Sequence, residues 1–94
     1  MKPDITKIIE RAVRHCCYWW KLPSAYEINN GSCEEFVALI CKFVPGAEDN
    51  ATPDFTLPGH YWIEYEGKCY DAECPQGVDH WEQLPIFVKY RQRS

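Results

Sequence analysis

One stretch of the chain decides the fold: HYWIEYEGKCYDA, residues 60–72. Aromatic and β-branched residues gather on both sides of Glu66-Gly67, which is typical of two strands joined by a tight turn. A two-residue turn would pair Tyr65 with Lys68, and that pair sets all the others. The stretch therefore predicts an antiparallel β-hairpin.

The predicted register decides which side chains meet. Asp71 would lie opposite Trp62 and diagonal to His60, a backbone separation of about 7–8 Å that an imidazole and a carboxylate can span. Glu73 would lie directly opposite His60 and is the alternative partner for its imidazole. A bulge at Gly67 would shift the register by one residue and reverse the two faces.

An amphipathic helix is predicted ahead of the hairpin, over residues 5–20. Its apolar residues follow the i, i+3, i+4, i+7 spacing of a helix with one buried face. Asp4 is a suitable N-cap. Residues 21–32 are rich in turn-forming types and predict an irregular connection.

A second amphipathic helix is predicted to begin at Cys33 and to end at Pro45-Gly46. Ser32 and Glu35 have the spacing of a capping box, which would place Cys33 in the first turn. A thiol there lies at the positive end of the helix dipole, which favours the thiolate. Cys33 also lies on the apolar stripe, so a small buried hydrophobe is the alternative interpretation.

The rest of the chain predicts little regular structure apart from one strand. Residues 47–58 suggest a polar loop, 75–77 a turn, 79–83 a short turn or helix, and 86–90 a strand. Residues 1–94 are thus expected to form one α+β domain, with two N-terminal helices packed on a small antiparallel sheet of about three strands.

Composition narrows the classes of function. The 94 residues are 46% hydrophobic and 15% aromatic, enough for a folded core. The net charge of −4 disfavours nucleic acid as a partner, because phosphate binding needs a basic surface. No apolar run approaches the ~18 residues of a membrane span, and no signal peptide opens the sequence. We expect a cytoplasmic protein that does not bind membranes.

The cysteines do not form a metal-binding pattern. Cys69 and Cys74 with His80 would be a poor zinc ligand set, and no Cys-x-x-Cys pair is present. In a reducing compartment the default is free thiols. We therefore expect no metal, no other cofactor and no disulfide among the six cysteines, Cys16, Cys17, Cys33, Cys41, Cys69 and Cys74.

Three segments resemble the transglutaminase-like branch of the papain-type cysteine enzymes. They are GSCEEFVALI (31–40), HYWIEY (60–65), which is similar to the family's His-x-Trp-x-Glu strand, and GKCYD (67–71). The resemblance spans residues 26–72, half the chain, in the family's order of cysteine, histidine and aspartate. The chain departs from the family in its small size, which leaves little room for substrate-binding walls.

The resemblance implies roles for named residues. Cys33 would be the nucleophile, His60 the general acid and base, and Asp71 the residue that orients the imidazole. The oxyanion would need two donors. One would be the backbone N–H of Cys33, and the candidates for the other are Asn29, Asn30 and Tyr26. The candidates for binding substrate are Tyr61, Trp62 and Trp81.

The resemblance implies a cysteine-dependent acyl-transfer enzyme that forms a thioester on Cys33 and acts on a protein or peptide. Amide or isopeptide hydrolysis, deamidation and transamidation remain equally open, because they differ only in the group that resolves the thioester. The alternative is a non-catalytic binding or inhibitor module that keeps the fold. Its partner would contact an aromatic surface made of Tyr61, Tyr65, Tyr70 and Trp81.

Overall fold

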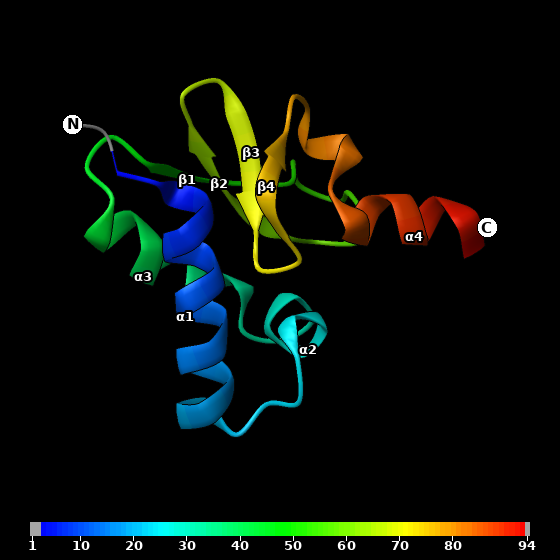
Figure 1. Ribbon diagram of the computed structural model, residues 1–94. Helices are drawn as coiled ribbons and strands as arrows, with labels where there is room; N and C mark the ends of the chain where they lie inside the picture. The colour runs from blue at the N-terminus through cyan, green and yellow to red at the C-terminus, as the bar shows by residue number, and fades with distance from the viewer. Residues whose placement is uncertain (1–2, 94) are drawn as a thin grey trace.

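A computed structural model describes residues 3–93 and shows an α+β architecture (Figure 1). Four strands form one antiparallel sheet in the order β1-β2-β3-β4, so sequential strands are neighbours in space. The elements are α1 (Ile5–Trp20), α2 (Ala25–Asn29), α3 (Cys33–Phe43), β1 (Glu48–Ala51), β2 (Tyr61–Tyr65), β3 (Lys68–Asp71), β4 (Cys74–Val78), the 3-10 helix η1 (Trp81–Gln83) and α4 (Pro85–Arg93).

Helix α1 has the predicted bounds. The Asp4 side chain accepts a hydrogen bond from the backbone N–H of Lys7 at 3.2 Å, which satisfies one free donor of the first turn. At the other end Lys21 adopts left-handed backbone angles, with φ of 57°, and its N–H bonds the Cys17 carbonyl. This is a common way for a helix to end.

Helix α3 begins at Cys33, as predicted, but not by means of a capping box. The Ser32 side chain makes no cap hydrogen bond, and the helix starts with the Phe36 N–H bonding the Ser32 carbonyl at 3.0 Å. The connection before it is also more ordered than predicted, because Ala25–Asn29 form the short helix α2. That helix presents the buried Ile28 and Asn29 to the protein interior.

The hairpin has the predicted register. Tyr65 pairs with Lys68 and Ile63 with Tyr70, with Glu66 and Gly67 at positive φ in the turn. Positive φ at both central residues is the requirement of a type I′ turn. No bulge shifts the pairing between β2 and β3. Trp62 therefore lies on the same face of the sheet as Cys69, as the predicted register requires.

Two polar segments form edge strands that the sequence did not indicate. β1 lies inside the predicted loop 47–58 and pairs with β2 although its side chains are largely exposed. β4 includes the predicted turn 75–77 and pairs with β3 through a register shift between Cys69 and Asp71. A proline is tolerated there because an edge strand has an unpaired side.

The strand predicted over residues 86–90 is wrong, because these residues lie in α4. Pro85 occupies the first helical position, where its missing N–H costs nothing. Leu84 and Phe87, three residues apart, are both buried against the sheet. The turn or short helix predicted near 79–83 is confirmed as η1.

The sheet separates two hydrophobic cores. One face carries Ile63 and Tyr65 and packs against α1 and α3. The other carries Trp62 and packs against η1 and α4. α3 and α4 accordingly lie on opposite sides of the sheet (Figure 1). Among the described residues no helix is long and apolar enough to cross a membrane.

Candidate active site

Cys33, His60 and Asp71 are brought to one place by three different elements. Cys33 opens α3, His60 precedes β2, and Asp71 ends β3. The Asp71 carboxylate oxygen Oδ2 lies 3.0 Å from His60 Nε2. Both residues are buried, at 2% and 1% exposure, so water does not compete for this hydrogen bond.

Asp71, rather than Glu73, contacts the imidazole. Its second oxygen, Oδ1, accepts the backbone N–H of Glu73 at 3.0 Å, so both carboxylate oxygens have a partner. The Glu73 side chain points elsewhere, accepting Asn29 Nδ2 and Lys89 Nζ at 2.9 Å each. The two carboxylates therefore have separate positions and separate partners.

The second ring nitrogen of His60 is left for Cys33. Nδ1 is buried and has no hydrogen bond of standard geometry within residues 3–93. The thiol is nevertheless close enough to the ring for Cys33 to raise the pKa of His60 and for His60 to lower the pKa of Cys33. An imidazole with a carboxylate on one side and a thiol on the other is the arrangement of a cysteine nucleophile and its base.

The electrostatic surroundings of Cys33 differ from those of the other cysteines. Burial raises the pKa of its thiol, but His60 and the backbone N–H groups of Tyr61 and Glu34 lower it by more, so the net pKa falls below the ordinary value. All the other cysteines have a raised pKa, with burial as the main cause; they are Cys16, Cys17, Cys41, Cys69 and Cys74. Cys33 is thus the thiol most inclined to ionise.

His60 has the opposite shift. Burial lowers its pKa, but hydrogen bonds and charge from Asp71 and Cys33 raise it to about 9, well above the ordinary 6.5. The raised pKa of His60 and the lowered pKa of Cys33 both favour a thiolate–imidazolium pair over a neutral pair. This pair supplies both a nucleophile and a proton donor.

Phe87 of α4 completes the burial of His60, a role that the sequence pattern did not predict. Its ring meets the imidazole edge-on, with centroids 5.6 Å apart, and it also packs against Trp81 at 5.0 Å. This role was not recognised because residues 86–90 were predicted to form a strand. A helix-starting proline, Pro85, between Leu84 and Phe87, which lie three residues apart, was the signal that could have revealed it.

An open cavity of about 330 Å³ lies at Cys33, and we call it the Cys33 hollow. Asn29 and Asn30 line it, as the oxyanion expectation requires, but their side-chain amides already donate to Glu73 and to the Tyr26 carbonyl respectively. Tyr26 lines a neighbouring hollow instead. The remaining wall is formed by Gly31, Glu34, Glu35, Pro58, Gly59, Tyr61 and Ile86.

The three aromatic residues considered for substrate binding lie in different places. Tyr61 lines the Cys33 hollow, where the negative charge of Glu34 raises the pKa of its hydroxyl. Trp62 is only 1% exposed and stacks beneath Trp81 with ring centroids 5.3 Å apart, so it is not accessible to a substrate. Trp81 lines other hollows and is not part of the wall around Cys33.

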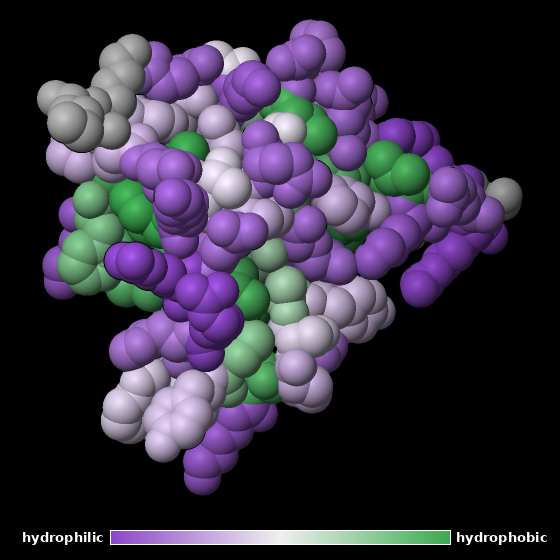
Figure 2. Space-filling model, viewed as in Figure 1, coloured by the Kyte–Doolittle hydropathy of each residue, from purple (hydrophilic) through white to green (hydrophobic). Residues whose placement is uncertain are grey.

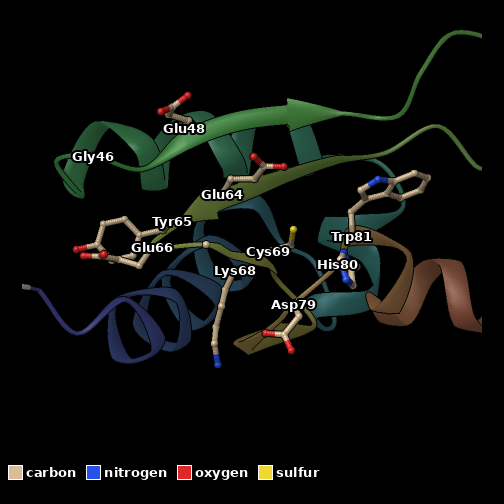
Figure 3. A pocket seen from close by; sticks show the side chains of 11 residues that line it. Gly46, Glu48, Glu64, Tyr65, Glu66, Lys68, Cys69, Asp79, His80 and Trp81 are labelled. Carbon is tan, nitrogen blue, oxygen red and sulfur yellow. The ribbon is translucent and has the colours of Figure 1, made fainter.

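A second large hollow contains none of the three clustered residues. It has a volume of about 360 Å³ and is lined largely by charged side chains of the β2–β3 hairpin and the segment before η1. Glu48 and Lys68 point away from one another there (Figure 3). Across residues 3–93, no group of three or more His, Cys, Asp or Glu residues could hold a metal ion.

Comparison with known proteins gives no further guidance. No protein-family model, no curated protein and no solved structure matches the chain.

Proposed function

We propose that this protein is a cysteine-dependent acyl-transfer enzyme that acts on an amide or isopeptide bond of a protein or peptide. The observation that carries the proposal is the buried pair of His60 and Asp71, with Nε2 3.0 Å from Oδ2, beside Cys33. The imidazole lowers the pKa of the Cys33 thiol, and Asp71 raises the pKa of His60. This electrostatic pattern separates Cys33 from every other cysteine of the chain. It also accounts for the burial of an aspartate and a histidine, Asp71 and His60.

The first half of the reaction follows from the positions of the three side chains. The Cys33 thiolate attacks the amide carbonyl carbon, and a C–S bond forms. Protonated His60 gives its proton to the leaving nitrogen as the C–N bond breaks, so an amine departs and a thioester remains. Asp71 holds the ring and stabilises the imidazolium without accepting the proton. The backbone N–H groups in the first turn of α3, which have no intrahelical partner, are the donors we assign to the oxyanion.

The second half regenerates the thiolate. Water or an amine attacks the thioester, neutral His60 accepts a proton from it, and the C–S bond breaks. Water gives hydrolysis or deamidation, and an amine gives transamidation. The open Cys33 hollow admits either nucleophile, and Tyr61 is the wall residue that we assign to substrate contact. We place the protein in the cytoplasm, where a reducing medium would keep its thiols free.

The decisive measurement reads the six cysteines separately. Iodoacetamide labelling is followed by mass spectrometry from pH 5 to pH 9, with Cys41 of the same helix α3 as the internal control. We expect Cys33 to react fastest below pH 8, because its thiolate persists where the other thiols are protonated. If Cys33 is labelled no faster than Cys41 or Cys69, the proposal is wrong.

A companion experiment tests acylation itself. p-Nitrophenyl acetate should transfer its acetyl group to Cys33, visible as an acetylated Cys33 peptide together with released p-nitrophenol. Cys33→Ala should abolish this while leaving the circular dichroism spectrum unchanged, because alanine favours helix and the thiol is only partly buried. Cys41→Ala is the matched control and should acylate normally.

One observation favours a binding function as a second candidate. An apolar groove of about 500 Å³ lies between α1 and α3, and we call it the α1–α3 groove. Ile8, Leu39 and the largely exposed Phe43 line it, and hydrophobic side chains gather on the α3 side of the molecule in Figure 2. Two residues of the aromatic surface expected from sequence, Tyr65 and Tyr70, are instead buried in the core.

The two candidate functions make opposite predictions for two variants. If the protein only binds, Phe43→Asp should abolish its biological effect and Cys33→Ala should leave it intact. If it is an enzyme, Cys33→Ala should be the damaging change. Both variants must first show native circular dichroism.

A further inference from the structure

Glu73 makes polar contacts with three separate elements of the molecule, α2, β3 and α4. Its carboxylate accepts Asn29 Nδ2 from α2 and Lys89 Nζ from α4, each at 2.9 Å. Its backbone N–H donates to Asp71 at 3.0 Å. Its side chain is 13% exposed, which is low for a glutamate between β3 and β4.

The bond to Asn29 is the one that bears on the reaction proposed above. Asn29 is 3% exposed and ends α2, four residues before Cys33. Glu73 lies two residues after Asp71, and its own N–H fixes the Asp71 carboxylate. The Asn29–Glu73 bond therefore ties the segment leading to the nucleophile to the turn that carries the aspartate.

The bond to Lys89 is of a different kind. The Lys89 side chain is 49% exposed, so water and salt screen its ion pair with Glu73. The lysine also lies over the ring of Tyr26, which gives it a second contact. Loss of this lysine would leave Glu73 able to accept from Asn29.

We propose that Glu73 is a positioning residue, which sets the geometry of Cys33, His60 and Asp71 through its hydrogen bond to Asn29. This inference rests on the acyl-transfer function proposed above. Glu73 touches neither the thiol nor the imidazole, and acts by holding Asp71 and the start of α3 at a fixed separation. Small displacements of reacting groups are costly, with about 1 Å able to change a rate by about a hundredfold.

The test compares Glu73→Ala with Glu73→Gln. Alanine removes both side-chain bonds, whereas glutamine keeps an oxygen that can accept from Asn29 and loses only the charge that attracts Lys89. The readout is the pH midpoint of Cys33 alkylation. In Glu73→Ala we expect the midpoint to rise by about one pH unit, which lowers the thiolate fraction below it about tenfold. Glu73→Gln and Lys89→Met should both stay within about twofold of the wild-type rate.

Two further variants keep the test decisive. Asn29→Ala removes the same hydrogen bond from its other end and should reproduce the Glu73→Ala shift, which matters if Glu73→Ala fails to fold. Ile9→Val destabilises the larger core at a buried residue that does not line the Cys33 hollow, and should leave the midpoint unchanged although the protein melts earlier.

The outcomes separate this inference from the proposed function. A wild-type Cys33 no faster than Cys41 would overturn the acyl-transfer proposal itself. A fast wild-type Cys33 with an unchanged midpoint in both Glu73→Ala and Asn29→Ala would overturn only the role of Glu73. So would a Glu73→Gln protein as impaired as Glu73→Ala, or a Lys89→Met protein with the same defect.

Discussion

Burial alone would keep Cys33 and His60 uncharged, because a low-dielectric interior disfavours ions. The observed shifts have the opposite net direction, since each group stabilises the charged form of the other and Asp71 adds its own charge. The ionised state of the nucleophile is thus a property of the pair. Removal of either member should affect the other.

The first prediction follows for His60→Ala. Without the imidazole, burial again dominates, so the pKa of Cys33 should rise and its thiolate fraction at pH 7 should fall. Iodoacetamide labelling should show the midpoint of Cys33 moving upward by at least about one pH unit. His15→Ala, which changes a histidine of α1 outside the site, should leave that midpoint in place. An unmoved midpoint in His60→Ala would show that the thiol is not coupled to the ring.

A second prediction concerns Asp71→Asn. The amide keeps the shape of the side chain but removes the charge that raises the pKa of His60, so that pKa should fall from about 9. Titration of the His60 ring protons by NMR measures this directly. By analogy with triads of this type, acylation should fall by a factor between about 10² and 10⁴. Asp79→Asn, an exposed carboxylate before η1, is the control and should change neither quantity.

At the scale of elements, helix α4 and the edge strand β4 each make a close side-chain contact whose loss can be measured. Phe87 is 4% exposed and its ring contacts His60, Trp62 and Trp81. One side chain therefore both stabilises the second core and covers the imidazole. Its loss should affect stability and reactivity together.

The third prediction is that Phe87→Ala lowers the free energy of unfolding by about 3–5 kcal/mol, the usual cost of removing a buried phenylalanine. Urea denaturation followed by circular dichroism measures this value. Tyr90→Ala, on the exposed part of the same helix, should cost less than about 1 kcal/mol. Equal losses in the two variants would mean that α4 does not pack as described.

The fourth prediction compares two glycines with nearly equal φ angles. Gly77 in β4 has φ of 80°, and a Cβ added there would lie 2.6 Å from the Tyr70 ring. Gly67 in the hairpin turn has φ of 78°, with open space around it. Alanine at Gly67 should cost only the backbone penalty of about 1–2 kcal/mol, and alanine at Gly77 should cost clearly more. Thermal unfolding of the two variants tests the difference, and equal melting temperatures would contradict it.

Elements with a strong local pattern were predictable, and elements fixed by distant partners were not. The apolar stripe of residues 5–20 predicted α1, and the Glu66-Gly67 turn predicted the hairpin register. That register places His60 and Asp71 on one face of the hairpin. β1 has polar, largely exposed residues, so only its pairing with β2 makes it a strand. The β-branched and aromatic run at 86–88 favours a strand locally, but burial of Leu84 and Phe87 selects a helix.

At the scale of the whole molecule, the two hydrophobic cores differ in size and in their relation to the site. The core formed by α1, α3 and one face of the sheet contains most of the fully buried apolar residues. The smaller one, formed by η1, α4 and the other face, covers His60. Cys33 lies at the first residue of α3, so the nucleophile belongs to the larger core and its base to the boundary with the smaller one.

Because the N-terminal part of a chain is synthesised first, we expect the larger core to assemble before α4 covers His60. The ribosome completes Arg93 about 1–4 s after Asp71, at about 5–20 residues per second. Throughout that interval the imidazole lacks the aromatic lid that α4 will provide. As a fifth prediction, ribosome-bound chains with residues 1–77 outside the exit tunnel should label slowly at Cys33, and chains with residues 1–93 outside it should label quickly. The newborn polypeptide would then carry a thiol of ordinary reactivity until α4 has left the exit tunnel and packed on the sheet.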